Sequence, residues 1–249
     1  MAVVPSIIWL LFFVLQKKHR EKTKDIVKVF LWGISIALPV VILEDWSIGI
    51  FAEFAANLFI TPFLMGFVAV SFIEEFAKYV VVRTKAMPYA FFDEPQDAII
   101  YMITAALGFA GIENFVYVLV NTSTPDMVIG MTILRGVSAN FLHVVASGFL
   151  GYFLALSIEH PREKRRFLYT GIIGATLLHG VFNNFIMELS DLISESSCSY
   201  VFGLVLEAGT KCTEEIFGIA LIGTLLTISG IIILIGLYKL AHARFPRRG

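Results

Sequence analysis

Charge is scarce in this chain. Only 16% of its 249 residues are Asp, Glu, Lys or Arg, against about 25% in an ordinary soluble domain. Strict alternation of polar and apolar residues is also absent, which disfavours strands and leaves helices as the predicted secondary structure. The scarcity of charge, together with a hydrophobic content of 57%, argues against a water-soluble fold.

Cysteine is nearly absent. Cys198 and Cys212 are the only two, too few for a disulfide framework, and they lack the spacing of a zinc or redox motif. They could pair if their shared loop faces an oxidising compartment. No Gly/Ser linker or low-complexity tract divides the chain, so residues 1–249 are predicted to form a single membrane domain.

Long apolar blocks are what the chain does contain, and their lengths suit the hydrocarbon core of a bilayer. The mean hydropathy is +0.81. The sequence therefore predicts an all-α, polytopic transmembrane helix bundle of about seven spans, of which the short first is the least typical. The blocks are Ala2–Leu15, Ile26–Leu43, Phe54–Val82, Ala98–Val120, Met127–Ile158, Phe167–Leu189 and Ile216–Leu240.

The basic residues orient these blocks, because Lys and Arg gather on the cytoplasmic side of a membrane. Counted loop by loop, 17 of the 19 basic residues fall on one side. Lys211 lies alone on the other side, beside acidic residues that include Glu44 and Asp45, and Arg135 lies within a span. This pattern predicts an outside N-terminus, an inside C-terminus and a multi-pass protein of the plasma membrane. Basic residues in such short clusters also argue against a nucleic-acid partner.

Ionisable residues inside the predicted spans are the candidates for function, because placing each one there costs roughly 2.5–3.5 kcal/mol. In the third span, Glu74 and Lys78 are spaced i, i+4 and can pair. Glu75 lies about 100° further round the helix and needs another partner. The simpler alternative is that both carboxylates cap the cytosolic end of the helix and have no catalytic role.

The next three spans add further polar groups. Glu113 and Tyr117 share one face of the fourth span and could form a structural hydrogen bond, as could Asn114. The fifth span contributes Arg135, Asn140 and His143, and the sixth contributes His179 and Asn183. Counted inward from the predicted cytosolic flanks, His179 lies about 20 Å deep, and His143 and Glu113 about 24 Å. We expect these groups to converge on one buried cavity.

Two chemistries suit this set of residues. In one, Glu75 activates water, Lys78 holds Glu74 as its partner, and His143, His179 and Asn183 orient the water and bind the oxyanion. In the other, His143, His179 and Glu113 ligate zinc while a second glutamate acts as base. No His-Glu-x-x-His motif occurs, and the sequence leaves both mechanisms open.

Five ordered motifs resemble the PrsW family of intramembrane proteases, which is similar to the CAAX prenyl proteases and bacteriocin-processing membrane proteases. They are Glu74–Lys78, Phe92–Tyr101, Gly108–Tyr117, Arg135–His143 and His179–Asn183. The resemblance implies cleavage of a membrane-anchored protein, as in site-1 cleavage of an anti-sigma factor. It places a protease core at about residues 54–189. The N-terminal spans within 2–43 and the last span at 216–240 lie outside it.

Two other classes of protein compete with the protease. Intramembrane Glu, Arg and His also mark ion or proton pathways, so a transporter or channel is one alternative. Pro39 and Pro62 do not occupy corresponding places in two halves, as broken helices of many transporters do. A catalytically inactive membrane adaptor is the other alternative.

Overall fold

The structure is a computed structural model that describes residues 1–15, 22–55, 64–195, 199–201 and 204–207, with five single residues between 228 and 239. Across these residues the chain is mostly helical, with a short antiparallel pair of strands, β1 (Ser199–Val201) and β2 (Leu204–Glu207). The predicted all-α class is confirmed. Cys198, Cys212 and nearly all of the predicted span 216–240 lie outside the described residues.

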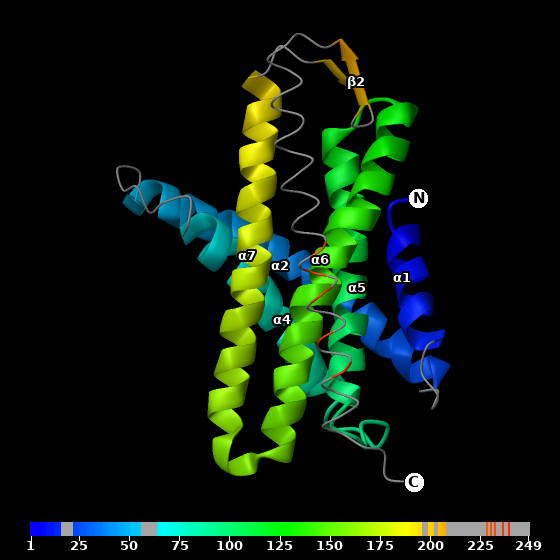
Figure 1. Ribbon diagram of the computed structural model, residues 1–249, viewed down its shortest axis with the longest axis vertical. Helices are drawn as coiled ribbons and strands as arrows, with labels where there is room; N and C mark the ends of the chain where they lie inside the picture. The colour runs from blue at the N-terminus through cyan, green and yellow to red at the C-terminus, as the bar shows by residue number, and fades with distance from the viewer. Residues whose placement is uncertain are drawn as a thin grey trace.

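Three long helices stand side by side and form the body of the molecule, while α2 crosses them at a slant and α1 lies beside α5 (Figure 1). The helices are α1 (Val4–Leu15), α2 (Thr23–Ala55), the π-helix η1 (Leu64–Phe72), α4 (Ile73–Lys85), α5 (Asp97–Asn121), α6 (Pro125–Glu159), the 3₁₀ turn η2 (Pro161–Glu163) and α7 (Lys164–Glu195).

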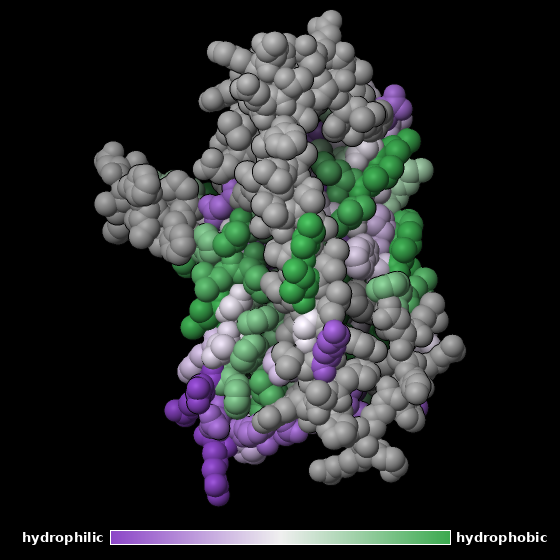
Figure 2. All heavy atoms as spheres, viewed as in Figure 1, coloured by the Kyte–Doolittle hydropathy of each residue, from purple (hydrophilic) through white to green (hydrophobic). Residues whose placement is uncertain are grey.

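Three of the described helices are long and apolar enough to cross a bilayer: α2 over Thr23–Glu53, α5 and α6. Figure 2 shows hydrophobic side chains over the middle of one face and hydrophilic ones gathered at its lower end. The chain is therefore a membrane protein. The count of seven spans and the predicted orientation remain predictions.

Helix α2 is longer than the sequence predicted. Its apolar block was expected to end at Leu43, with the acidic residues that follow in a loop, but the helix runs on to Ala55. Pro39 lies inside it and removes one helical hydrogen bond without ending the helix. The residues after Leu43 are polar, and polarity alone does not terminate a helix.

The contact between α2 and α5 depends on two glycines. A Cβ atom on Gly33 would lie 2.2 Å from the carbonyl oxygen of Ala105, and one on Gly108 would lie 2.1 Å from that of Phe30. Because neither backbone oxygen can yield as a flexible side chain would, both positions require glycine for this close approach. The glycines thereby bring the backbone of α2 against the helix that carries Glu113.

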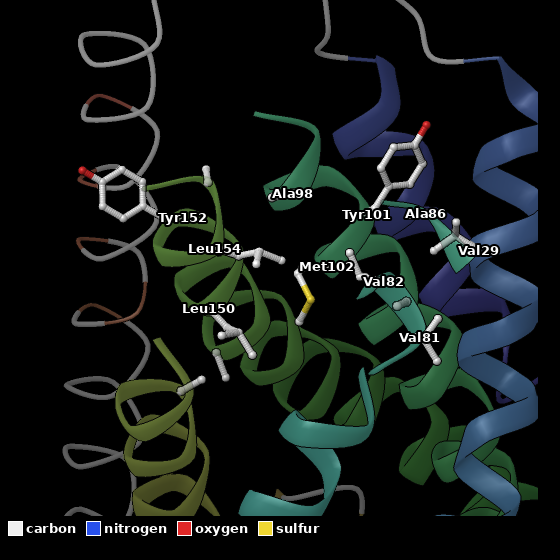
Figure 3. Close-up of a cluster of buried hydrophobic side chains, with 14 of the residues drawn as sticks. Val29, Val81, Val82, Ala86, Ala98, Tyr101, Met102, Leu150, Tyr152 and Leu154 are labelled. Atoms are coloured by element: carbon white, nitrogen blue, oxygen red, sulfur yellow. The ribbon is translucent and has the colours of Figure 1, made fainter. Parts of the chain in front are cut away.

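The main apolar core lies near the start of α2 and the end of α6. Figure 3 shows Met102 of α5 among side chains of α4 and α6, including Val82, Leu150 and Leu154. Tyr101 and Met102 are fully buried there. This core fixes α4, α5 and α6 against one another and so sets the positions of the polar groups that they carry.

Candidate active site

The glutamate pair begins α4, directly after the π-helix η1. The two helices form one continuous run, and the Ser71 hydroxyl donates to the carbonyl of Gly66, five residues earlier, at 2.7 Å. Short π segments are frequent at functional sites. Glu74 and Glu75 are both buried, although they lie on adjacent positions of the helix. Each carboxylate therefore needs polar partners within the helix bundle.

Lys78 lies at the centre of these partners. Its ammonium group donates to Glu74 Oε2 at 2.9 Å and to Glu75 Oε1 at 2.8 Å. The third contact, at 2.8 Å, is with His143 Nδ1. An ammonium group has three donors and no acceptor, so all three of its protons are used. The predicted Glu74–Lys78 pair is confirmed, and Lys78 joins α4 to α6.

Glu75 is the more completely satisfied of the two glutamates. Besides Lys78, its Oε1 contacts Nδ1 of His179 at 2.9 Å, and its Oε2 accepts from the hydroxyl of Ser147 at 2.8 Å. Its side chain is 0% exposed. A buried carboxylate with three donors is held as an anion in one orientation. Ser147 was not among the residues that the sequence singled out.

His143 connects this centre to α5. Because its Nδ1 accepts from an ammonium group, its proton is on Nε2, which donates to Glu113 Oε2 at 2.8 Å. The other oxygen of Glu113 accepts a short hydrogen bond from Arg135. The predicted Glu113–Tyr117 hydrogen bond does not form. The Arg135 guanidinium instead stacks 4.2 Å from the ring centroid of Tyr117.

A chain of amides continues from Arg135 to the first helix. Arg135 Nε donates to Asn114 Oδ1 at 2.7 Å, and Asn114 Nδ2 donates to Asn140 Oδ1 at 2.9 Å. The same oxygen of Asn140 accepts from the Ser6 hydroxyl of α1 at 3.3 Å. Since Arg135 has only donors, it fixes the orientation of both amides. The predicted structural role of Asn114 fits this geometry, and Ser6 is an addition from the structure.

Glu44 is a third carboxylate that the structure brings to the site. It lies on the part of α2 that was expected to be a loop, and its carboxyl group is near enough to that of Glu74 for the two to interact. Two neighbouring carboxyl groups favour a shared proton, because both cannot ionise together at low cost. Its Oε1 is buried and has no hydrogen-bond partner. The uninterrupted helical sequence after Leu43 is the signal that would have revealed it.

The second imidazole is that of His179, which α7 brings to the two glutamates. His179 is 2% exposed, its Nε2 lies 3.8 Å from Glu74 Oε2, and its ring stands edge-on to that of His143 with centroids 5.1 Å apart. Asn183 lies one turn further along α7 and is half-buried. The side chain of Asn183 makes no hydrogen bond to another described residue.

Four side chains have the type and spacing of metal ligands: Glu74, Glu75, His143 and His179 have donor atoms within 4.8 Å of one another. The Lys78 ammonium, however, already engages three of the four. Both nitrogens of His143 are used as well, one by Lys78 and one by Glu113. A divalent ion would have to displace this ammonium group and break those bonds. As arranged, the donor set does not fit a metal.

Carboxylates and imidazoles enclosed by apolar helices are the kind of site that a membrane-embedded peptidase requires. A family model described as PrsW family intramembrane metalloprotease matches residues 21–208. The chain belongs to the PrsW family, as its motifs predicted. Helix α1 lies outside the matched residues.

Proteins named Protease PrsW are similar to this chain. The chain is 28% identical to Protease PrsW of Oceanobacillus iheyensis over 73% of this chain and 79% of that one. It is 27% identical to the Halalkalibacterium halodurans protein over 73% and 80%. With Protease PrsW of Geobacillus kaustophilus it shares 25% identity over 73% and 76%. No solved structure matches the chain significantly.

Proposed function

We propose that this protein is an endopeptidase that hydrolyses a peptide bond of a membrane-anchored protein with a water molecule activated by Glu74. One observation carries the assignment of the base, namely the unequal hydrogen bonding of the two glutamates. Glu75 accepts from Lys78, His179 and Ser147. Glu74 accepts from Lys78 alone among these groups and contacts Glu44. Glu74 therefore has fewer donors on its carboxylate than Glu75, which leaves it the glutamate open to a water molecule; the sequence assigned that role to Glu75.

His179 is suited to orient the water. Since Glu75 is held as an anion, His179 Nδ1 carries the proton and donates to it, which leaves Nε2 as an acceptor toward Glu74. A water oxygen about 2.8 Å from both acceptors would subtend an angle of about 85° between them, near the angle between its two O–H bonds. Both protons of the water would then be bound, and a lone pair would be free to attack.

The reaction follows from these positions. The water oxygen attacks the carbonyl carbon of the scissile bond, and its proton passes to Glu74. The amide of Asn183, which has no other described partner, would donate to the oxyanion. Glu74 then returns the proton to the leaving nitrogen as the C–N bond breaks, which gives a carboxylic acid and an amine. His143, Glu113 and Arg135 act as supports that position Lys78.

The substrate class follows from the location of the site. A scissile bond must reach groups enclosed by apolar helices, which suits a substrate that is itself anchored in the membrane, such as an anti-sigma factor cleaved at its first site. The protein would act as a multi-pass enzyme of the plasma membrane. Zinc held by His143, His179 and Glu113 is the alternative mechanism, and the hydrogen bonds of Lys78 and His143 weigh against it.

The test uses purified protein in detergent and a panel of single-span substrates. We expect Glu74→Gln to lower kcat about 10²–10⁴-fold, the usual contribution of a general base. Glu75→Gln keeps a hydrogen-bonding group in the same volume and should lower kcat less. Chelator should leave cleavage unchanged. Zinc-dependent recovery after chelation, or full activity of Glu74→Gln, would contradict the mechanism.

If no substrate in the panel is cleaved, the inactive adaptor and the transporter return as explanations. A transporter would be recognised by ion flux into vesicles that contain the purified protein. Thermal unfolding of each variant shows whether a loss of activity reflects a loss of fold.

A further inference from the structure

A cavity of about 330 Å³ lies along one stripe of α2, away from the glutamate site. Its volume falls at the lower end of the range for small-ligand sites. The stripe is basic at the start of α2 and apolar further along, over about 16 Å of helix. It is lined by Lys24, Val27, Lys28, Leu31, Trp32 and Ser35.

The end of α4 adds a third ammonium group to this stripe. Lys85 Nζ lies 4.0 Å from the centroid of the Trp32 ring, and Lys28 Nζ lies 3.7 Å from that of Tyr89 in the connection after α4. These two cation–π contacts join α2 to the end of α4 and to the connection that follows it. None of Lys24, Lys28 and Lys85 forms an ion pair with a carboxylate among the described residues. The cavity therefore carries positive charge without a counter-ion from the described part of the chain.

The apolar side of the cavity indicates what that counter-ion is attached to. Three apolar side chains of the cavity are exposed: Val27 (45%), Leu31 (53%) and Trp32 (39%). They belong to a helix apolar enough to cross the bilayer, so they can face lipid. A ligand that satisfies both ends must have an anionic head and a hydrocarbon tail. Free phosphate would use only the lysines.

We propose that this cavity binds an anionic phospholipid from the leaflet at the basic end of the molecule. The headgroup phosphate lies among Lys24, Lys28 and Lys85, and an acyl chain follows Leu31 and Trp32 toward the bilayer centre. Basic pockets between membrane helices recognise headgroups in this way. Because Lys85 ends the helix that begins with Glu74 and Glu75, the bound lipid would tie α2 to the helix that carries the catalytic pair.

Trp32 provides a direct measure of lipid at the site. The Trp9→Phe/Trp46→Phe protein has Trp32 as its only tryptophan, so fluorescence quenching by brominated acyl chains reports on lipid in contact with that ring. It is reconstituted in phosphatidylcholine vesicles with a minor fraction of phosphatidylglycerol, with bromine on one lipid or on the other. We expect brominated phosphatidylglycerol to quench well beyond its mole fraction, since each lysine near an anionic headgroup favours it about fivefold.

The matched variants separate a defined site from general surface charge. Lys24→Gln/Lys28→Gln/Lys85→Gln should reduce quenching by phosphatidylglycerol to its mole fraction. Arg162→Gln/Lys164→Gln/Arg165→Gln removes three exposed positive charges from η2 and the start of α7 and should leave the preference intact. Lys24→Gln alone, which breaks no ring contact, should weaken the preference about fivefold even if the triple variant does not fold.

Three outcomes would overturn the proposal. The first is equal quenching by the two lipids, and the second is an equal loss of preference in the two triple variants, which would indicate diffuse surface attraction. The third is reversal of the preference by excess inorganic phosphate, which would indicate an anion site that does not select lipid. Catalysis does not enter the measurement, so the result is independent of the proposed peptidase mechanism.

Discussion

Replacement of Ser147 by alanine tests whether Glu75 is held as a buried anion. The Ser147 hydroxyl is one of three donors to a carboxylate that is 0% exposed, and it lies 2.8 Å from Oε2. A hydrogen bond to a charged group contributes about 1.5–3 kcal/mol. We expect Ser147→Ala to lower the free energy of unfolding by that amount. Because Glu75 also holds His179, kcat should fall several-fold.

Ser157 offers a matched control on the same helix. It is buried like Ser147, but its hydroxyl donates to the carbonyl of Leu154 in its own helix. Loss of that neutral bond should cost less than about 1 kcal/mol. Unfolding by SDS in mixed micelles, followed by tryptophan fluorescence, measures both variants, and cleavage of a single-span substrate measures kcat. Equal destabilisation by Ser147→Ala and Ser157→Ala would refute the special role of the hydroxyl.

Two further predictions concern α2. Glu44→Gln retains a donor toward Glu74 and should keep most of the cleavage activity, whereas Glu44→Ala should lower kcat about tenfold; equal rates for the two variants would argue against a shared proton. Gly108→Ala should lower the free energy of unfolding by about 1–3 kcal/mol, since its Cβ would meet the Phe30 carbonyl, while Gly49→Ala meets nothing within 4 Å and should be neutral or stabilising. A neutral Gly108→Ala in the same micelle assay would show that α2 and α5 can separate at little cost.

Uninterrupted apolar runs were the most predictable part of the fold. The blocks Ala98–Val120 and Met127–Ile158 correspond to helices α5 and α6 within two residues at each end. The start of α6 has a clear physical basis, because Thr124 caps it by accepting from the amide of Met127 and Pro125 occupies its first turn. Where the apolar run and the helix end at different residues, as in α2, hydropathy alone gave the wrong boundary.

The ionisable residues of the candidate site were predictable from the sequence, because a charged group inside a membrane span is costly. Glu74, Glu75, His143 and His179 stood out because ionisable groups inside a span require partners, and the structure brings all four together. Ser147 did not stand out, since serine is common in membrane helices and only the tertiary arrangement shows that it faces Glu75. The partners of Glu113 could not be predicted from residue spacing within one helix, because Arg135 and His143 lie on another helix.

The continuous helix from Leu64 to Lys85 has a consequence for membrane insertion. It carries five charged residues, and the three between positions 74 and 78 would each cost roughly 2.5–3.5 kcal/mol inside the bilayer. Lys78 offsets part of this cost within the helix by pairing with both glutamates. The remaining partners, His143 and His179, are synthesised later. This helix is therefore expected to settle in its final position only after α6 and α7 have packed against it, so that completion of the site and completion of the bundle coincide during biogenesis.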